Sequence, residues 1–217
     1  MLSCRQGRRS LLFHLVAPFD LQLTVRKRGA AMIRSFLAVG VACTLASCTT
    51  ATPTGAPMKT YGYAFAPPAF YSFCKKQPRL CDTQSGDAVV MMTKAKADQL
   101  QAVNHLVNSR VRMRSDLATS GTDDVWRVPS DVGDCEDFAI GKKDELMKRG
   151  WPSSAMLLTV AYPRFSKEGH TVLTVRTSEG DLILDSLTST VMKWSDTNYR
   201  FFARQSQDNP DTWERLS

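Results

Sequence analysis

The chain has 217 residues and a formal net charge of +7, from 28 Lys and Arg against 21 Asp and Glu. Residues 1–47 hold seven of these basic residues and one of the acidic ones, so residues 48–217 carry 21 basic and 20 acidic side chains. This balance removes any compositional reason to expect nucleic-acid binding, and the length suits one compact domain, which we expect to be a monomer.

The start of the chain has the order of a bacterial export signal. From Met32, one basic residue, Arg34, precedes an apolar run at residues 36–42 and then Leu-Ala-Ser-Cys at residues 45–48. This is the order of n-region, h-region and cleavage site, and the apolar run is too short to span a bilayer. The last four residues resemble the lipobox of bacterial lipoprotein signals, in which the cysteine is lipidated and becomes the first mature residue.

We therefore expect residues 1–47 to be a leader that includes a lipoprotein signal peptide, with translation starting at Met32. Cys48 is the predicted lipidation site. An ordinary secretory signal, or a buried helix, is the alternative for residues 32–48. Export would place the protein in the periplasm, and acyl chains on Cys48 would anchor it to a membrane, for which we favour the outer over the inner one.

Two segments of different character follow the leader. Residues 48–68 are rich in Thr, Pro, Ala and Gly without apolar periodicity, which predicts a flexible tether before a folded domain at residues 69–217. Residues 93–118 lack Gly and Pro and place apolar residues at helical spacing, which predicts one long amphipathic helix. The composition of residues 121–133 then predicts an irregular loop.

A second helix is predicted to begin at Cys135. Asp134 can cap it and Asp137 can return the bond in the manner of a capping box, while Gly150 and Pro152 mark its end. Beyond Pro152, β-branched runs with a period of two predict strands at residues 155–161, 170–177, 181–185 and 199–203. Helices followed by strands indicate an α+β domain in which helices pack on an antiparallel sheet.

The six cysteines divide by position. Two lie before the predicted cleavage site and a third is the predicted lipid acceptor. Cys74 and Cys81 are seven residues apart around Pro78, which in an oxidising compartment predicts a disulfide. A metal site is the alternative, but it lacks other His or Cys ligands nearby. Cys135 remains as the cysteine without a structural or anchoring role.

Cys135 has the setting of a nucleophile, because the first turn of a helix favours a thiolate through its unpaired N–H groups and the macrodipole. Of the three histidines, one lies in the leader and His105 lies inside the first predicted helix, so His170 at the start of a strand is the candidate base. Asp185, at the end of the next strand, can orient the imidazole. A four-residue turn between these strands would place Asp185 opposite Thr174, so a bulge or another register is needed.

These residues resemble the bacterial transglutaminase-like cysteine proteinases, a family that includes periplasmic proteases that release large adhesins from the cell surface. The resemblance is carried by residues 133–139 with Lys142 and Leu146, by residues 170–173 and 184–187, by residues 73–81, and by residues 124–126 with Pro129. The three motif residues follow in the order Cys, His, Asp. Ser186 stands where members of the family often have Asn.

The resemblance implies a papain-like or transglutaminase-like fold and a cysteine peptidase that acts on a protein substrate, with a surface adhesin as the candidate. Cys135, His170 and Asp185 would do the chemistry without a cofactor. Carboxylates beside the thiol oppose the thiolate, and bound calcium would offset them. Adhesin-releasing relatives need calcium, which the resemblance extends to Asp134 and Glu136; the alternative is that these two cap the helix and face water.

Two other functions fit the same residues. A transglutaminase or amidase would use the same triad with an amine in place of water, so only its products would distinguish it. A non-catalytic lipoprotein, a binding module on a degenerate peptidase fold, would lack a reactive Cys135, which a thiol-directed probe would reveal. We predict hydrolysis of a peptide bond in a periplasmic or surface protein.

Overall fold

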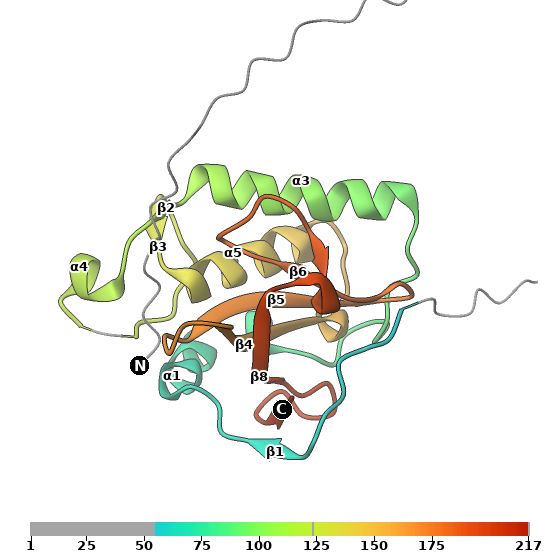
Figure 1. Cartoon of the computed structure of the whole chain (residues 1–217). Helices are drawn as coiled ribbons and strands as arrows, with labels where there is room; N and C mark the ends of the chain where they lie inside the picture. Colours follow the sequence, from blue (N-terminus) through green and yellow to red (C-terminus); the bar gives the residue numbers. More distant parts are fainter. Residues whose placement is uncertain (1–54, 123, 217) are drawn as a thin grey trace, which may run out of the picture. The chain divides into compact units, whose positions relative to one another are not determined.

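The computed structural model of the chain describes residues 55–122 and 124–216 (Figure 1). At its centre is a seven-stranded sheet of order β1-β9-β8-β4-β5-β6-β7, in which every pairing is antiparallel. The strands are β1 (Tyr63–Ala64), β4 (Met156–Pro163), β5 (His170–Thr177), β6 (Gly180–Leu184), β7 (Met192–Lys193), β8 (Tyr199–Gln205) and β9 (Trp213–Arg215). The helices are α1 (Pro68–Lys76), α2 (Pro78–Cys81), α3 (Lys94–Arg110), α4 (Asp116–Ser120) and α5 (Cys135–Lys148). This is the α+β arrangement predicted from the order of elements.

Helix α5 lies between α3 and the sheet, as Figure 1 shows, and contacts β5. It is buried on almost every side, even at Lys142 and Lys143. A helix that is covered on two sides has no solvent face, so its sequence lacks a single apolar stripe. Phe138 of α5 packs in the main core with Val107 of α3 and with Leu173 of β5, which fixes the helix against the sheet.

The second predicted helix and the four predicted strands are confirmed. Helix α5 begins at Cys135 and ends at Lys148, shortly before Gly150, whose φ of +81° ends the helix in a conformation that favours glycine. Strands β4, β5, β6 and β8 match the predicted runs to within two residues at each end. Strands β1, β7 and β9 were not predicted, because elements of two or three residues show no periodicity.

The prediction of one helix over residues 93–118 was wrong at its end. The Thr93 hydroxyl accepts a hydrogen bond from the Lys96 amide at 3.2 Å and so marks the start as expected. Helix α3 nevertheless ends at Arg110, and β2 (Arg112–Met113) then pairs in parallel with β3 (Val132–Gly133). Val111 is buried here and Met113 is partly buried, which a continued helix could also give, so their spacing could not reveal the change.

The prediction of a tether over residues 48–68 was also too long. Residues 48–54 lie outside the described residues, but the chain from Gly55 onward lies on the domain. The Met58 amide donates to the Asp181 carboxylate at 2.9 Å, the Trp194 indole donates to the Ala56 carbonyl at 2.8 Å, and β1 pairs with β9. Small residues and prolines can therefore line a sheet edge, and packing starts well before residue 69.

The predicted leader, its signal peptide and Cys48 lie outside the described residues, and their roles stay predictions. Within residues 55–122 and 124–216, none of the helices has the length and hydropathy needed to cross a bilayer.

The predicted disulfide is present and joins Cys74 of α1 to Cys81 of α2. We expect the double substitution Cys74→Ala/Cys81→Ala to lower the free energy of unfolding by about 2 kcal/mol, because a cross-link over a short loop restricts the unfolded chain. Urea unfolding of both proteins would measure this. As a control, a reductant should lower the urea midpoint of the parent protein and leave that of the double variant unchanged. Equal urea midpoints for the parent and the double variant without reductant would contradict the expectation.

Candidate active site

Cys135 is the first residue of α5, and its side chain is buried. The helix begins there, since the first intrahelical bond runs from the Phe138 amide to the Asp134 carbonyl at 3.0 Å. The N–H groups of this first turn and the macrodipole favour negative charge on the sulfur. The helical setting predicted for the thiol is thus the one observed.

The predicted capping box is not formed. The Asp134 carboxylate accepts from the Asp116 amide at 3.2 Å, and the Asp137 carboxylate accepts from the Arg127 amide at 2.9 Å. Both carboxylates therefore hold the segment that precedes the helix, instead of the helix's own amides. The spacing of Asp134 and Asp137 is compatible both with a capping box and with hydrogen bonds to the preceding loop. The folded position of that loop determines which of the two forms.

The sulfur of Cys135 lies against β5 at Thr171, the residue after His170. The Thr171 amide donates a hydrogen bond to Sγ at 3.3 Å. The β5–β6 ladder ends at the pair Leu173 with Leu184. Beyond that pair, backbone N–H groups of β5 are no longer bonded to β6, and the Thr171 amide can donate to the sulfur. A backbone donor at this distance favours a negatively charged sulfur.

His170 and Asp185 are brought together, with Nε2 and Oδ1 2.6 Å apart and both side chains buried. As expected, this contact needs a register other than the one a four-residue turn would give, and the structure has such a register. Thr177 pairs with Gly180, so the turn contains only two residues, and the register continues to place Asp185 next to Val172 on the neighbouring strand. His170 and Val172 point to the same face of a strand, and Asp185 therefore reaches His170 diagonally. Gly180, at a φ of +98°, allows the tight turn.

Several further donors hold Asp185. Its Oδ1 also accepts from the Leu187 amide at 3.0 Å, its Oδ2 accepts from the Tyr199 hydroxyl at 2.5 Å, and its carbonyl accepts from the Asn108 side chain at 2.9 Å. Burial by itself raises the pKa of Asp185, but the hydrogen bond and charge of His170 and the bond from Tyr199 outweigh it and leave the pKa below its usual range. Asp185 is thus held as a carboxylate.

Sequence reasoning missed Tyr199 and Asn108. Tyr199 was only the first residue of a predicted strand, and Asn108 was only a polar residue of a predicted helix. Neither stands near Asp185 in the chain, so no local pattern could have assigned them.

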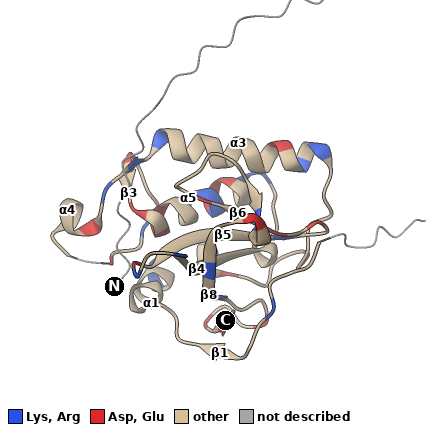
Figure 2. Ribbon diagram, in the orientation of Figure 1, with Lys and Arg blue, Asp and Glu red and all other residues tan. Residues whose placement is uncertain are grey.

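A group of three buried carboxylates lies beside the start of α5. Asp116, Asp134 and Asp137 bring oxygens within 4.8 Å of one another, and Figure 2 shows acidic residues at the starts of α4 and α5. Burial and the charge of Asp116 raise the pKa of Asp134 to about 6, and burial raises the pKa of Asp137 to about 8. We call these three residues the acidic cluster.

Arg127 is the cation nearest to this cluster in the described part of the chain. Its guanidinium approaches Asp116 at 2.9 Å and Asp137 at 3.2 Å. One positive charge leaves three carboxylates undercompensated, and the buried Oδ1 of Asp134 has no hydrogen-bond partner in the described structure. Oxygen donors of this kind fit a calcium ion.

The predicted calcium pair, Asp134 and Glu136, lies at this place, and its role stays a prediction. Asp134 belongs to the acidic cluster, and Glu136 lies against Asp134 with its Oε2 3.3 Å from the Cys135 sulfur. Burial, and then the charge of Asp134, raise the pKa of Glu136 well above its usual range. The alternative that both residues face water is wrong, because both are buried.

Trp126, an indole in the loop before α5, lies in the core and not at the Cys135 site. Its ring contacts Phe70 and Trp213 at centroid distances of 5.8 and 6.4 Å, and its indole N–H donates to Asp124 at 2.9 Å. The Cys135 backbone N–H at the helix start remains as the expected donor to an oxyanion.

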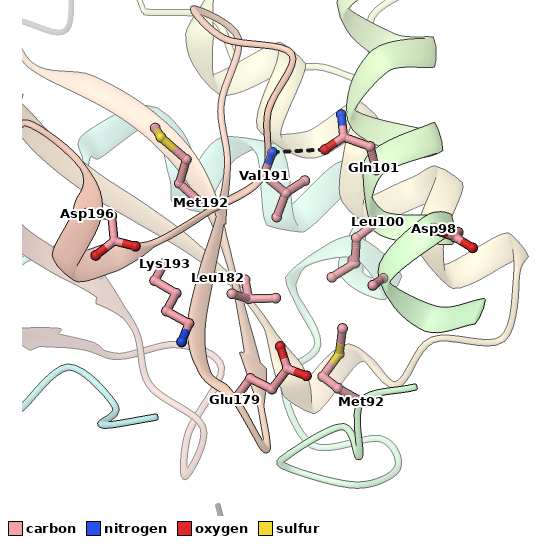
Figure 3. A pocket seen from close by; sticks show the side chains of 11 residues that line it. Met92, Asp98, Leu100, Gln101, Glu179, Leu182, Val191, Met192, Lys193 and Asp196 are labelled. Atoms are coloured by element: carbon pink, nitrogen blue, oxygen red, sulfur yellow. Dashed lines mark hydrogen bonds between the residues drawn. The ribbon is translucent and has the colours of Figure 1, made fainter. Parts of the chain in front are cut away.

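A cavity of about 470 Å³ lies elsewhere, between α3 and the β6–β7 edge of the sheet. Figure 3 shows Leu100 and Leu182 at this cavity, with Glu179 and Lys193 also on its lining. None of its lining residues belongs to the Cys135 site or to the acidic cluster, so this cavity is not the candidate active site.

Comparisons with known proteins identify the family of the chain. The family model of the bacterial transglutaminase-like cysteine proteinases matches residues 60–217. Among solved structures, Legionella pneumophila LapG is 34% identical with a TM-score of 0.43, over 50% of this chain and 64% of that one. The EGTA-treated LapG gives the same identity and TM-score and is covered over 62%. The calcium-bound LapG is 27% identical with a TM-score of 0.47, over 67% of this chain and 88% of that one.

The chain spans less than two thirds of the first two LapG chains, and no curated protein matches it. TM-scores of 0.43 and 0.47 are too low to establish a shared fold. The assignment of the chain to a family therefore rests on the family model, which covers most of the chain and includes every residue of the site. The chain belongs to the family of bacterial transglutaminase-like cysteine proteinases.

Proposed function

We propose that this protein is an exported cysteine peptidase that hydrolyses a peptide bond in a periplasmic or surface protein, with Cys135 as nucleophile, His170 as base and Asp185 as the group that orients His170. The observation that carries the proposal is the buried His170–Asp185 pair, at 2.6 Å, together with the amide of the following residue, Thr171, which donates to the Cys135 sulfur at the helix start. A nucleophile, a base and an orienting group in this relation are the parts that acyl transfer needs.

In the proposed reaction, the Cys135 thiolate attacks the carbonyl carbon of the peptide bond. The Cys135 N–H at the helix start would stabilise the oxyanion. Since Nε2 of His170 is bonded to Asp185, Nδ1 would give its proton to the leaving amine. Water deprotonated by His170 then attacks the thioester, releasing the carboxylic acid and regenerating the thiol.

Calcium would act on the charge balance of this site. The undercompensated acidic cluster next to the nucleophile supports binding by Asp116, Asp134 and Asp137. A bound divalent cation would neutralise carboxylates that otherwise oppose a thiolate at Cys135. The chemistry itself would still be done by the side chains of the triad.

The substrate and the location follow from the same proposal. A protein substrate fits the peptidase family, and we propose a surface adhesin by analogy with the adhesin-releasing relatives. The lipobox-like sequence before Cys48 supports a lipid anchor, preferably in the outer membrane.

The test compares the proteins released and retained by cells that carry the wild-type chain or Cys135→Ala. We expect at least one surface or periplasmic protein to be cleaved only with the wild type, and the cleavage to stop when a calcium chelator is added. Mass spectrometry of the new termini would identify a free carboxylate if water is the acceptor and an amide if an amine is. Identical sets of released and retained proteins in both cell types would reject the proposal.

A further inference from the structure

The hydroxyl of Tyr199 lies on the side of Asp185 that His170 does not use. Oδ1 of Asp185 is shared between His170 Nε2 and the Leu187 amide, while Oδ2 accepts from Tyr199 at 2.5 Å. No other donor to Oδ2 is recorded within the described residues. Three donors on two oxygens fix the plane of the carboxylate, and without Tyr199 that plane could rotate about the bond to Cβ.

Tyr199 also contacts His170 directly. The two ring centroids are 5.5 Å apart with an interplanar angle of 38°. Tyr199 begins β8 and is paired with Pro163 of β4, so its backbone is held by the sheet. One side chain on a rigid element therefore touches both members of the His170–Asp185 pair.

The phenol acts as a donor and not as an acid. Burial, followed by the charge of Asp185 and their hydrogen bond, raises the pKa of Tyr199 far above its usual value. The hydroxyl consequently keeps its proton at any pH at which a thiol peptidase works. The hydrogen bond and the charge of His170 still lower the pKa of Asp185 without it, so Asp185 would remain ionised.

We propose that Tyr199 is a positioning residue of the active site, which orients the Asp185 carboxylate through its hydroxyl and the His170 imidazole through its ring. The inference rests on the proposed function and adds a fourth side chain to it. Orientation of the base matters in the transition state, where the proton moves, and not in the binding of the substrate.

The test uses two substitutions that separate the contacts. Tyr199→Phe keeps the ring and removes the hydroxyl, and we expect kcat to fall about tenfold, the order of one charge-assisted hydrogen bond, with KM within about twofold. Tyr199→Leu removes the ring as well and should lower kcat further. The pH profile of kcat should change as well in Tyr199→Phe, because the Asp185 carboxylate loses its second side-chain donor.

Tyr162→Phe is the matched control. Tyr162 lies on the neighbouring strand β4, and no hydrogen bond of its hydroxyl is recorded in the part of the chain that the structure describes; its ring packs against Phe202 at 5.9 Å. This variant should keep the wild-type kcat and pH profile. All rates are divided by the concentration of active sites, titrated with a thiol-directed inhibitor, so that a loss of folded protein does not count as a loss of kcat.

The outcomes distinguish this inference from the proposed function. If wild-type protein cleaves its substrate and Cys135→Ala does not, but Tyr199→Phe matches the wild type in kcat and in pH profile, then the role of Tyr199 is rejected alone. A fall in activity that appears only as fewer titratable sites would also reject it, since that is a packing effect. If Cys135→Ala cleaves as well as the wild type, the proposed function itself fails.

Discussion

His170→Ala is expected to lower kcat/KM by about 10⁴-fold or more in protein that remains folded. The substitution removes both the acceptor of the thiol proton and the donor to the leaving amine. It also leaves the buried Asp185 carboxylate without its 2.6 Å partner. Cleavage of the identified substrate, or of a peptide that spans its cleavage site, measures the effect.

His105→Ala is the matched control for this prediction, because His105 is an exposed histidine on α3. Its removal should leave kcat/KM unchanged. Asp185→Asn should lose less than His170→Ala, since an amide oxygen can still accept from Nε2 although it cannot balance an imidazolium. A His170→Ala protein with more than about a tenth of wild-type activity would be incompatible with a base at this position.

Removal of calcium is expected to have the second large effect. With EGTA we expect activity to fall at least about tenfold and to return when calcium is added in excess, because the uncompensated acidic cluster then disfavours the Cys135 thiolate. Calcium at about 100 times its Kd should stabilise the fold by about 2.7 kcal/mol, which raises Tm by roughly 5 to 10 °C for a domain of this size. Isothermal calorimetry and thermal unfolding measure binding and stability without a substrate.

Stability against pH gives a further readout of the same cluster. The pKa values of Asp134, about 6, and Asp137, about 8, lie above those of an unfolded chain, so without calcium the folded state binds more protons. Stability from these groups is therefore present at low pH and is lost as pH rises from about 4 to about 8. Calcium holds both groups ionised, and the decline should become smaller when it is bound.

Asp134→Asn should abolish the stabilisation by calcium, whereas Asp131→Asn should keep it. Asp131 lies nearby but is exposed and pairs with Arg112 at 3.1 Å. Equal calcium affinity for the wild type and Asp134→Asn would remove the acidic cluster from consideration as the binding site.

The local chemistry of the sequence determined the elements that carry the site. Gly150 and Pro152 after Lys148 mark the end of α5, and β-branched runs defined the strands that bear His170 and Asp185. Caps, turn residues and periodicity act over a few residues, so they can be read without the fold. The spacing of Cys74 and Cys81 predicted their disulfide for the same reason.

Only the tertiary structure decided which side chains meet. The end of α3 at Arg110 depends on the pairing of β2 with β3, and the meeting of Asp185 with His170 depends on a two-residue turn that the sequence had suggested was longer. The donors Tyr199 and Asn108 lie far from Asp185 in the chain. Several donors could have bonded to the Asp185 carboxylate, and tertiary packing determines which ones do. These donors come from other parts of the sequence, so the spacing of residues near Asp185 does not predict them.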